Sequence, residues 1–184
     1  MHRRAFLATC AALAWSPPLV RAGLMSTRLA AAWQAETGYQ VGILEAGTEL
    51  RIIAAIDVPT RAHALLRETD DHLLAVARRP GDWLLRFSPG GRALAWRWIE
   101  PGRAFTGHAL RNGAHLYVAE TDLETGQGLI GVRDAVSLEK QAEWPTHGID
   151  PHQLRWDIIR LAALLVANGG VPTRPEAGRR NTDL

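Results

Sequence analysis

The stretch His108-Ala109-Leu110 has a counterpart 45 residues earlier, at His63-Ala64-Leu65, and another 44 residues later, at His152-Gln153-Leu154. Each copy is followed by a short turn and an apolar run. In the two complete units a further strand-like segment comes next, first at residues 83–87 and then at residues 128–132. Self-similarity at a fixed period indicates a repeat architecture. The chain is therefore predicted to consist of structural units of about 45 residues.

The last strand of each unit keeps the same phase, because Leu50, Leu94 and Leu138 are 44 residues apart each time. A period near 45 with about four short strands per unit is typical of a propeller blade. We therefore predict an all-β fold, a β-propeller of four-stranded blades, with about three and a half blades in residues 23–171. A plain β-sandwich is the alternative. It explains short strands but not a fixed period with histidine in one phase.

The turns support short antiparallel strands, and two stretches fit the repeat less well. Residues 88–91 (Ser-Pro-Gly-Gly) and 111–113 (Arg-Asn-Gly) are hairpin signals. Residues 24–34 are compatible with a short helix or an innermost strand. Residues 157–166 lack the expected turn and resemble an amphipathic helix. The polar segment 172–184 shows no strand pattern and is expected to be a tail.

The first 22 residues have the features of an export signal. Arg3 and Arg4 precede Ala-Phe-Leu, which is typical of a twin-arginine signal. A moderately apolar segment and a proline break follow, and the small residues before Gly23 predict cleavage after Ala22. An ordinary secretory signal is the alternative. We expect residues 1–22 to be a signal peptide that directs the protein to the periplasm.

Charge and cysteine content narrow the function classes. The chain has 21 basic and 19 acidic side chains, but residues 1–22 contain three arginines and no acid. The remainder is close to neutral, which argues against nucleic acid as a partner. The single cysteine, Cys10, lies within the leader, so the mature chain offers neither a disulfide nor a thiolate ligand. No apolar stretch is long enough to span a membrane.

Several further motifs occur together in an order that resembles a known family. They are residues 77–81, 107–108, 120–122, 126–134, 146–152 and 166–170. In this order they resemble a twin-arginine-exported bacterial domain-of-unknown-function family labelled uncharacterised iron-regulated protein. The resemblance implies a seven-bladed periplasmic propeller of roughly twice this length, no established reaction, and an imelysin-like periplasmic protein as partner.

The sequence departs from the family pattern near its end. A Thr-His-Pro-Asp motif of the family corresponds here to residues 173–176, with Arg174 in place of the histidine. The segment that should follow is replaced by residues 179–184. Together with the unit count, this predicts a truncated member that contains half of the ring. Closed propellers use roughly 4–8 blades.

The repeated histidines are the main candidates for a binding site. His63, His108 and His152 share one phase near the start of the innermost strand, and in a propeller that strand lines the central channel. Neutral imidazoles suit zinc, copper, iron or nickel. Glu120 is a candidate carboxylate ligand beside them, as is Asp122. We therefore predict a metal site, for iron or another transition metal, at His63, His108, His152 and Glu120.

Two other interpretations of the same residues stay open. A histidine in this phase can form structural hydrogen bonds within its own blade, and the protein would then be a structural interaction platform. A cofactor-holding, oxidoreductase-like propeller is the second. His147 and residues 78–81 are weaker candidates, the latter for an anion or an exposed turn. Because the sequence has no nucleophile elbow, phosphate loop or dinucleotide fingerprint, a binding role is favoured over an enzyme.

Overall fold

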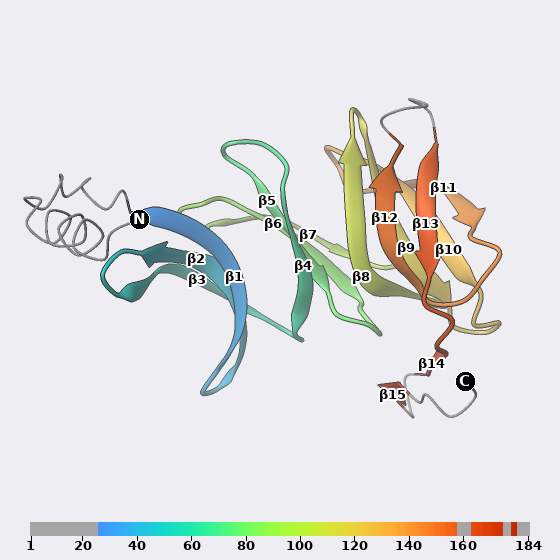
Figure 1. Cartoon of the computed structure of the whole chain (residues 1–184), viewed down its shortest axis with the longest axis horizontal. Helices are drawn as coiled ribbons and strands as arrows, with labels where there is room; N and C mark the ends of the chain where they lie inside the picture. Colours follow the sequence, from blue (N-terminus) through green and yellow to red (C-terminus); the bar gives the residue numbers. More distant parts are fainter. Residues whose placement is uncertain (1–25, 158–162, 175–177, 180–184) are drawn as a thin grey trace, which may run out of the picture.

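All secondary structure in the described part of the chain is β-strand (Figure 1). The computed structural model describes residues 26–157, 163–174 and 178–179. The signal-peptide predictions, including Arg3, Arg4 and the bond between Ala22 and Gly23, lie outside these residues. In the described ranges we find no helix that could cross a membrane.

The first three sheets are antiparallel meanders, each formed by strands that are consecutive in sequence. The first sheet consists of β1 (Thr27–Ala35), β2 (Gly38–Ala46) and β3 (Leu50–Val58). The second consists of β4 (Ala62–Arg67), β5 (Leu73–Ala77), β6 (Trp83–Phe87) and β7 (Ala93–Trp98). The third consists of β8 (Arg103–Asn112), β9 (His115–Asp122), β10 (Gly128–Asp134) and β11 (Lys140–Pro145).

Two smaller sheets follow. One pairs β12 (Pro151–Trp156) with β13 (Leu164–Asn168), and the other pairs β14 (Thr173–Arg174) with β15 (Gly178–Arg179). The all-β prediction is thus confirmed, and two of the five described sheets have the four antiparallel strands expected of a unit. Residues 27–35 of the first ambiguous stretch form a strand. The segment from residue 172 onward, expected to have no strands, contains the short β14–β15 pair.

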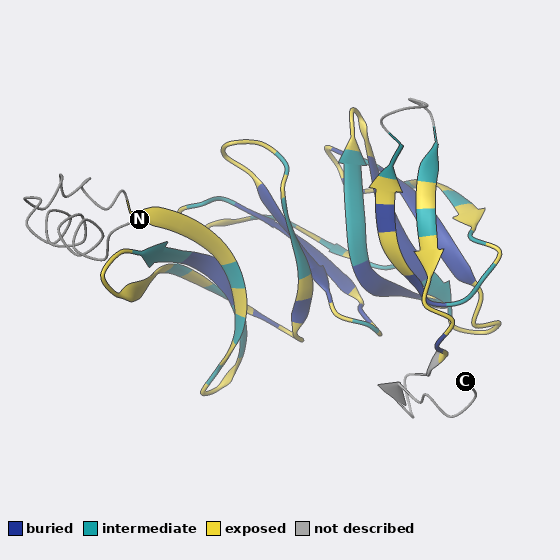
Figure 2. Ribbon diagram, viewed as in Figure 1, coloured by how far each residue is buried: buried dark blue, intermediate teal, exposed yellow. Residues whose placement is uncertain are grey.

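Neighbouring sheets pack face to face, and a strand in the second sheet shows how the sequence permits this. Leu73, Ala75 and Ala77 of β5 face the first sheet, whereas Leu74 and Val76 face the third. All five are buried, which Figure 2 shows as continuous dark blue along β5 and β6. A strand covered on both faces needs an uninterrupted apolar sequence, and residues 73–77 supply one. A third core joins the third sheet to β12 and β13.

A buried arginine also connects the second sheet to the third. Glu68, at the end of β4, accepts two hydrogen bonds from Arg86 of β6 at 2.6 and 2.8 Å. The same guanidinium donates to the carbonyl oxygens of Ala135 and Val136 in the third sheet. Arg86 therefore joins two sheets and satisfies carbonyl groups that would otherwise be buried without a partner.

Candidate functional site

The three repeated histidines occupy the same structural position in three sheets. His63 lies in β4, His108 in β8 and His152 in β12, each the first strand of its sheet. The ladder of each strand with its neighbour is irregular at the histidine. Ala62 and Ala64 are both paired with β5 while His63 between them is not, and His152 is skipped in the same way beside β13.

The irregularity in β8 spans three residues. Phe105 pairs with Glu120 and Ala109 with Val118, so residues 106–108 pass opposite a single residue of β9. A β-bulge redirects the side chain of its extra residue out of the regular pleat. The three histidines therefore all lie at interruptions of the strand ladder, of one residue in β4 and β12 and of three residues in β8, rather than at regular strand positions.

The bulges bring the three imidazoles together. The Nε2 atoms of His63 and His108 are 3.1 Å apart, and the ring centroids of these two residues are 4.8 Å apart. The ring of His152 lies 4.5 Å from that of His108 and 6.2 Å from that of His63. His108 is thus the central member of a compact cluster, which we call the histidine cluster (His63, His108 and His152).

The backbone of β8 approaches His63 closely at a glycine. Gly107 has a φ of 107°, and a Cβ atom added there would lie 2.8 Å from Cβ, Cγ and Cδ2 of His63. Only glycine tolerates both this backbone conformation and this contact. Beside it, the hydroxyl of Thr106 donates a hydrogen bond of 2.6 Å to the carbonyl oxygen of Pro151. The strands that carry His108 and His152 are thereby held side by side.

A buried ion pair fixes the start of β12. The guanidinium of Arg79, in the loop after β5, pairs with the carboxylate of Asp150, and only 12% and 2% of the two side chains are exposed. Asp150 has a positive φ of 58°, and its carbonyl oxygen accepts a hydrogen bond of 2.7 Å from the amide of Gly169. Residues 78–81, considered above as an exposed turn or anion site, thus contribute Arg79 to an internal link.

The histidine cluster favours the neutral imidazole. Burial lowers the pKa of His108 to about 4, and the neighbouring His152 and His63 add to this effect. The pKa of His63 is lowered as well, first by burial and then by the charges of His152 and Arg78. A neutral imidazole has a free lone pair, which is the form that binds a metal ion. At neutral pH His63 and His108 are therefore ready to act as ligands.

The distance between two Nε2 atoms is the geometric test of a shared metal ion. Imidazole nitrogens bind a transition metal at about 2.0–2.1 Å, so two of them on one ion lie roughly 2.9–3.4 Å apart for angles between 90° and 109°. The 3.1 Å between His63 and His108 falls within this range. Among the described residues no three His, Cys, Asp or Glu side chains form a complete metal site. The ring of His152 would have to turn toward the other two.

Glu120 does not join the histidine cluster. Its side chain is fully buried, with one carboxylate oxygen accepting a hydrogen bond of 2.9 Å from Arg133 and the other a bond of 2.6 Å from Lys140. Arg133 is fully buried too and pairs with Glu100 at 2.6 Å. Because both oxygens of Glu120 are engaged by cations, its role is to neutralise Arg133. The expected carboxylate ligand is therefore a structural group.

The carboxylate of the neighbouring Asp122 is also engaged in hydrogen bonds and an ion pair within the fold. Its carboxylate caps the turn after β9 by accepting hydrogen bonds from the amides of Glu124 and Thr125, and it pairs with Arg103 at 3.0 Å. These backbone hydrogen bonds, together with Arg103, lower the pKa of Asp122. A lowered pKa keeps Asp122 ionised, and its carboxylate oxygens are already engaged by the turn amides and Arg103.

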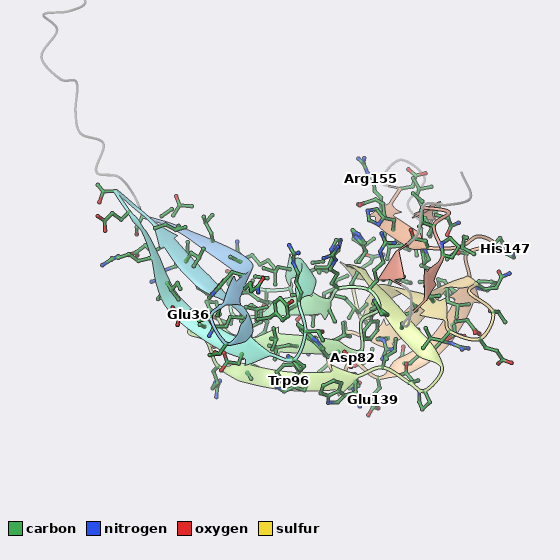
Figure 3. All side chains as sticks on the ribbon, turned by 90° about the horizontal axis from the view of Figure 1, so that it is seen from below. Glu36, Asp82, Trp96, Glu139, His147 and Arg155 are labelled. Carbon is green, nitrogen blue, oxygen red and sulfur yellow. The ribbon has the colours of Figure 1, made fainter. Side chains whose placement is uncertain are left out.

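The other sequence candidates lie elsewhere. His147 is an exposed residue of the loop between β11 and β12, where Figure 3 shows it at the periphery. Asn168, at the end of β13, is joined to this loop, because its amide oxygen accepts a hydrogen bond of 2.8 Å from the hydroxyl of Thr146. The sequence alone did not reveal the bulges or the partners of Glu120. The only sequence signal for them was the glycine before His108 and the cations at positions 133 and 140.

Fold and site together define an all-β protein of successive antiparallel sheets whose first strands present a cluster of three histidines. The family described as Protein of unknown function (DUF1513) matches residues 56–184, and the chain belongs to this family. The match includes all three histidines. No curated protein matches the sequence.

Proposed function

We propose that the chain is an exported metal-binding protein in which His63, His108 and His152 hold one transition metal ion. The observation that carries the proposal is the 3.1 Å separation of two Nε2 atoms from different sheets. Three histidines from the first strands of three sheets give a site in which each of these sheets supplies one ligand. Water or a ligand of a partner would complete the coordination, as at zinc sites with three protein ligands.

The architecture that we propose around this site is a propeller. Three of the sheets begin with a strand that carries one of the histidines, namely β4, β8 and β12, and these strands lie next to one another (Figure 1). Stacked four-stranded meanders with cores between them are the arrangement found in propeller blades. The described sheets would then be part of a ring whose channel the histidines line. Further blades and an imelysin-like partner are expectations that come from the family resemblance.

The export and iron-handling parts of the proposal rest on the sequence. The leader with Arg3 and Arg4 supports a periplasmic location, and the resemblance supports a role in iron handling. Among metals, imidazole suits iron, copper, nickel and zinc, and in general affinity rises from iron through nickel to copper. We therefore expect copper or zinc to bind at least as tightly in vitro as the iron that the resemblance suggests.

The hydrogen bond within the histidine cluster also favours a second candidate function. A neutral His63 and a neutral His108 can share one proton between their Nε2 atoms at 3.1 Å, which would join two sheets without any metal. In that case the protein is an interaction platform. The effect of added metal on the stability of the chain separates the two functions. A metal site gains stability from the bound ion, whereas a purely structural histidine pair does not.

Titration calorimetry with Cu²⁺ and Zn²⁺ on the mature chain tests the proposal. One ion per chain should bind, and His108→Ala should lose about 100-fold in affinity, at least as much as loss of an outer-shell partner. The matched control is His72→Ala, because His72 is an exposed histidine in the turn before β5. Equal affinity of wild type and His108→Ala would reject the metal site. So would the absence of metal binding, which would favour the structural function.

A further inference from the structure

A second candidate site, which contains none of the three histidines, is a cavity lined mainly by residues of β1 and β4. The cavity there has a volume of about 500 Å³. Its floor is apolar and includes Ile43, Leu65 and Leu73, of which Ile43 and Leu73 are buried core residues. Two cations, Arg28 and Arg67, lie at its wall. This volume is in the range of small-molecule sites, which are mostly apolar with few polar groups.

The charges around this cavity do not cancel. Arg67 is paired with Asp70 at 2.5 Å, and both residues line the cavity. Arg28 lies directly across the β1–β2 ladder from Glu45. That carboxylate is already bound by Arg51 of β3 at 2.5 Å. Of the charged residues that line the cavity, Arg67 and Asp70 pair with each other and Arg28 is a further cation, so the lining has one positive charge in excess.

We propose that this cavity binds a single-chain amphiphile with a carboxylate head, such as a medium-chain fatty acid. The hydrocarbon chain would lie along Ile43, Leu65 and Leu73, and the carboxylate would bind Arg28. Arginine suits this role because its planar fork matches a carboxylate with two parallel hydrogen bonds. A neutral apolar ligand would not use the charge of Arg28, and a cationic amphiphile would be repelled.

Two substitutions test the position of this site without touching the core. Ala30 is exposed and lines the cavity, so Ala30→Trp should fill it. Ala32 is the next exposed residue on the same face of β1 but does not line the cavity, and Ala32→Trp is the matched control. Arg28→Gln removes the charge, and Arg92→Gln is its control at an exposed arginine away from the cavity.

The probes are dodecanoate and dodecyltrimethylammonium, which have alkyl chains of nearly the same length and opposite charges. Both are titrated calorimetrically into the mature chain below their critical micelle concentrations. We expect one dodecanoate per chain, at least tenfold tighter than the ammonium. Arg28→Gln should weaken dodecanoate at least tenfold, Ala30→Trp should abolish its binding, and neither control should change it. Circular dichroism checks that each variant is folded.

Several results would overturn the proposal. Equal affinity for the two probes in the wild type would show a non-specific apolar surface, and this comparison needs no variant. Unchanged dodecanoate binding in Arg28→Gln would remove the carboxylate contact, and unchanged binding in Ala30→Trp would place the ligand elsewhere. Absence of saturable binding would reject the site. None of these results depends on the histidine cluster.

Discussion

The Nε2 atom of His63 lies 3.1 Å from the Nε2 atom of His108, although the two residues belong to different sheets and are 45 positions apart in sequence. Gly107 permits the close approach of β8 to His63, while the buried hydroxyl of Thr106 and the ion pair of Arg79 with Asp150 hold β12, which carries His152, beside β8. Substitutions of the residues around the histidine cluster should therefore change the free energy of unfolding and the metal affinity to different extents.

The first prediction concerns the pH dependence of folding. The folded pKa of His108 is about 4, below the ~6.5 of an unfolded chain. The unfolded state therefore binds more protons between these values, and stability should fall as the pH drops from about 6.5 toward 4. After allowance for partial solvent screening the loss is on the order of 1–2 kcal/mol.

Urea unfolding at pH 7.5, 6 and 5 measures this loss in the metal-free chain. His108→Gln cannot titrate in this range and should have a flatter profile. His115→Gln, an exposed histidine in β9, is the control and should follow the wild type. If His108→Gln and wild type show the same slope, the imidazole of His108 is not held neutral by its surroundings.

The second prediction concerns Gly107. Gly107→Ala introduces a Cβ atom 2.8 Å from three side-chain atoms of His63 and strains a backbone with positive φ. Gly102→Ala is a matched control, because Gly102 also has a positive φ of 75° but nothing lies within 4 Å of the added Cβ. The control should lose about 1–2 kcal/mol from backbone strain alone. Gly107→Ala should lose more and should also weaken metal binding, as measured by urea unfolding and calorimetry. Equal losses in the two variants would show that His63 moves aside freely.

The third prediction concerns the ion pair of Arg79 and Asp150. Asp150→Asn keeps the side-chain shape and tolerates the positive φ, so the change isolates the charge. An unpaired buried guanidinium should destabilise the chain by about 3–5 kcal/mol. Asp70→Asn breaks the exposed pair with Arg67 and should cost less than about 1 kcal/mol. Thermal and urea unfolding of the two variants compare these losses, and a small effect at Asp150 would mean that the pair does not hold β12 in place.

The fourth prediction separates Glu120 from metal binding. Glu120→Gln leaves the fully buried Arg133 with one carboxylate fewer and should destabilise the chain by about 3 kcal/mol. Because both oxygens of Glu120 are engaged by Arg133 and Lys140, the Cu²⁺ affinity of the folded variant should equal that of the wild type. A tenfold loss of Cu²⁺ affinity in calorimetry, with the variant folded, would restore Glu120 as a ligand.

The repeat made much of this arrangement predictable. A period near 45 placed His63, His108 and His152 on equivalent strands, and the hairpin signals at residues 88–91 and 111–113 mark real turns between strands. Sequence periodicity specifies equivalent positions because each unit folds as one supersecondary element.

The failures have a common physical cause. Glu120 was considered as a ligand because a carboxylate could complete a histidine metal site, but its partners Arg133 and Lys140 come from the next two strands. Cross-strand pairing depends on register, and a bulge shifts register by an amount that sequence does not reveal. The ion pair of Arg79 and Asp150 links loops 71 residues apart, and no local pattern indicates such a contact.

X-ray absorption spectroscopy of the chain loaded with one equivalent of Cu²⁺ or Zn²⁺ shows whether the three histidines share one metal ion. We expect nitrogen ligands at about 2.0–2.1 Å with the outer-shell scattering of three imidazole rings. In His108→Ala at the same metal concentration this signature should disappear, whereas in the His72→Ala control it should persist. A first shell of oxygen atoms alone, or an imidazole signature that persists unchanged in His108→Ala, would contradict the assignment of His63, His108 and His152 as one metal site.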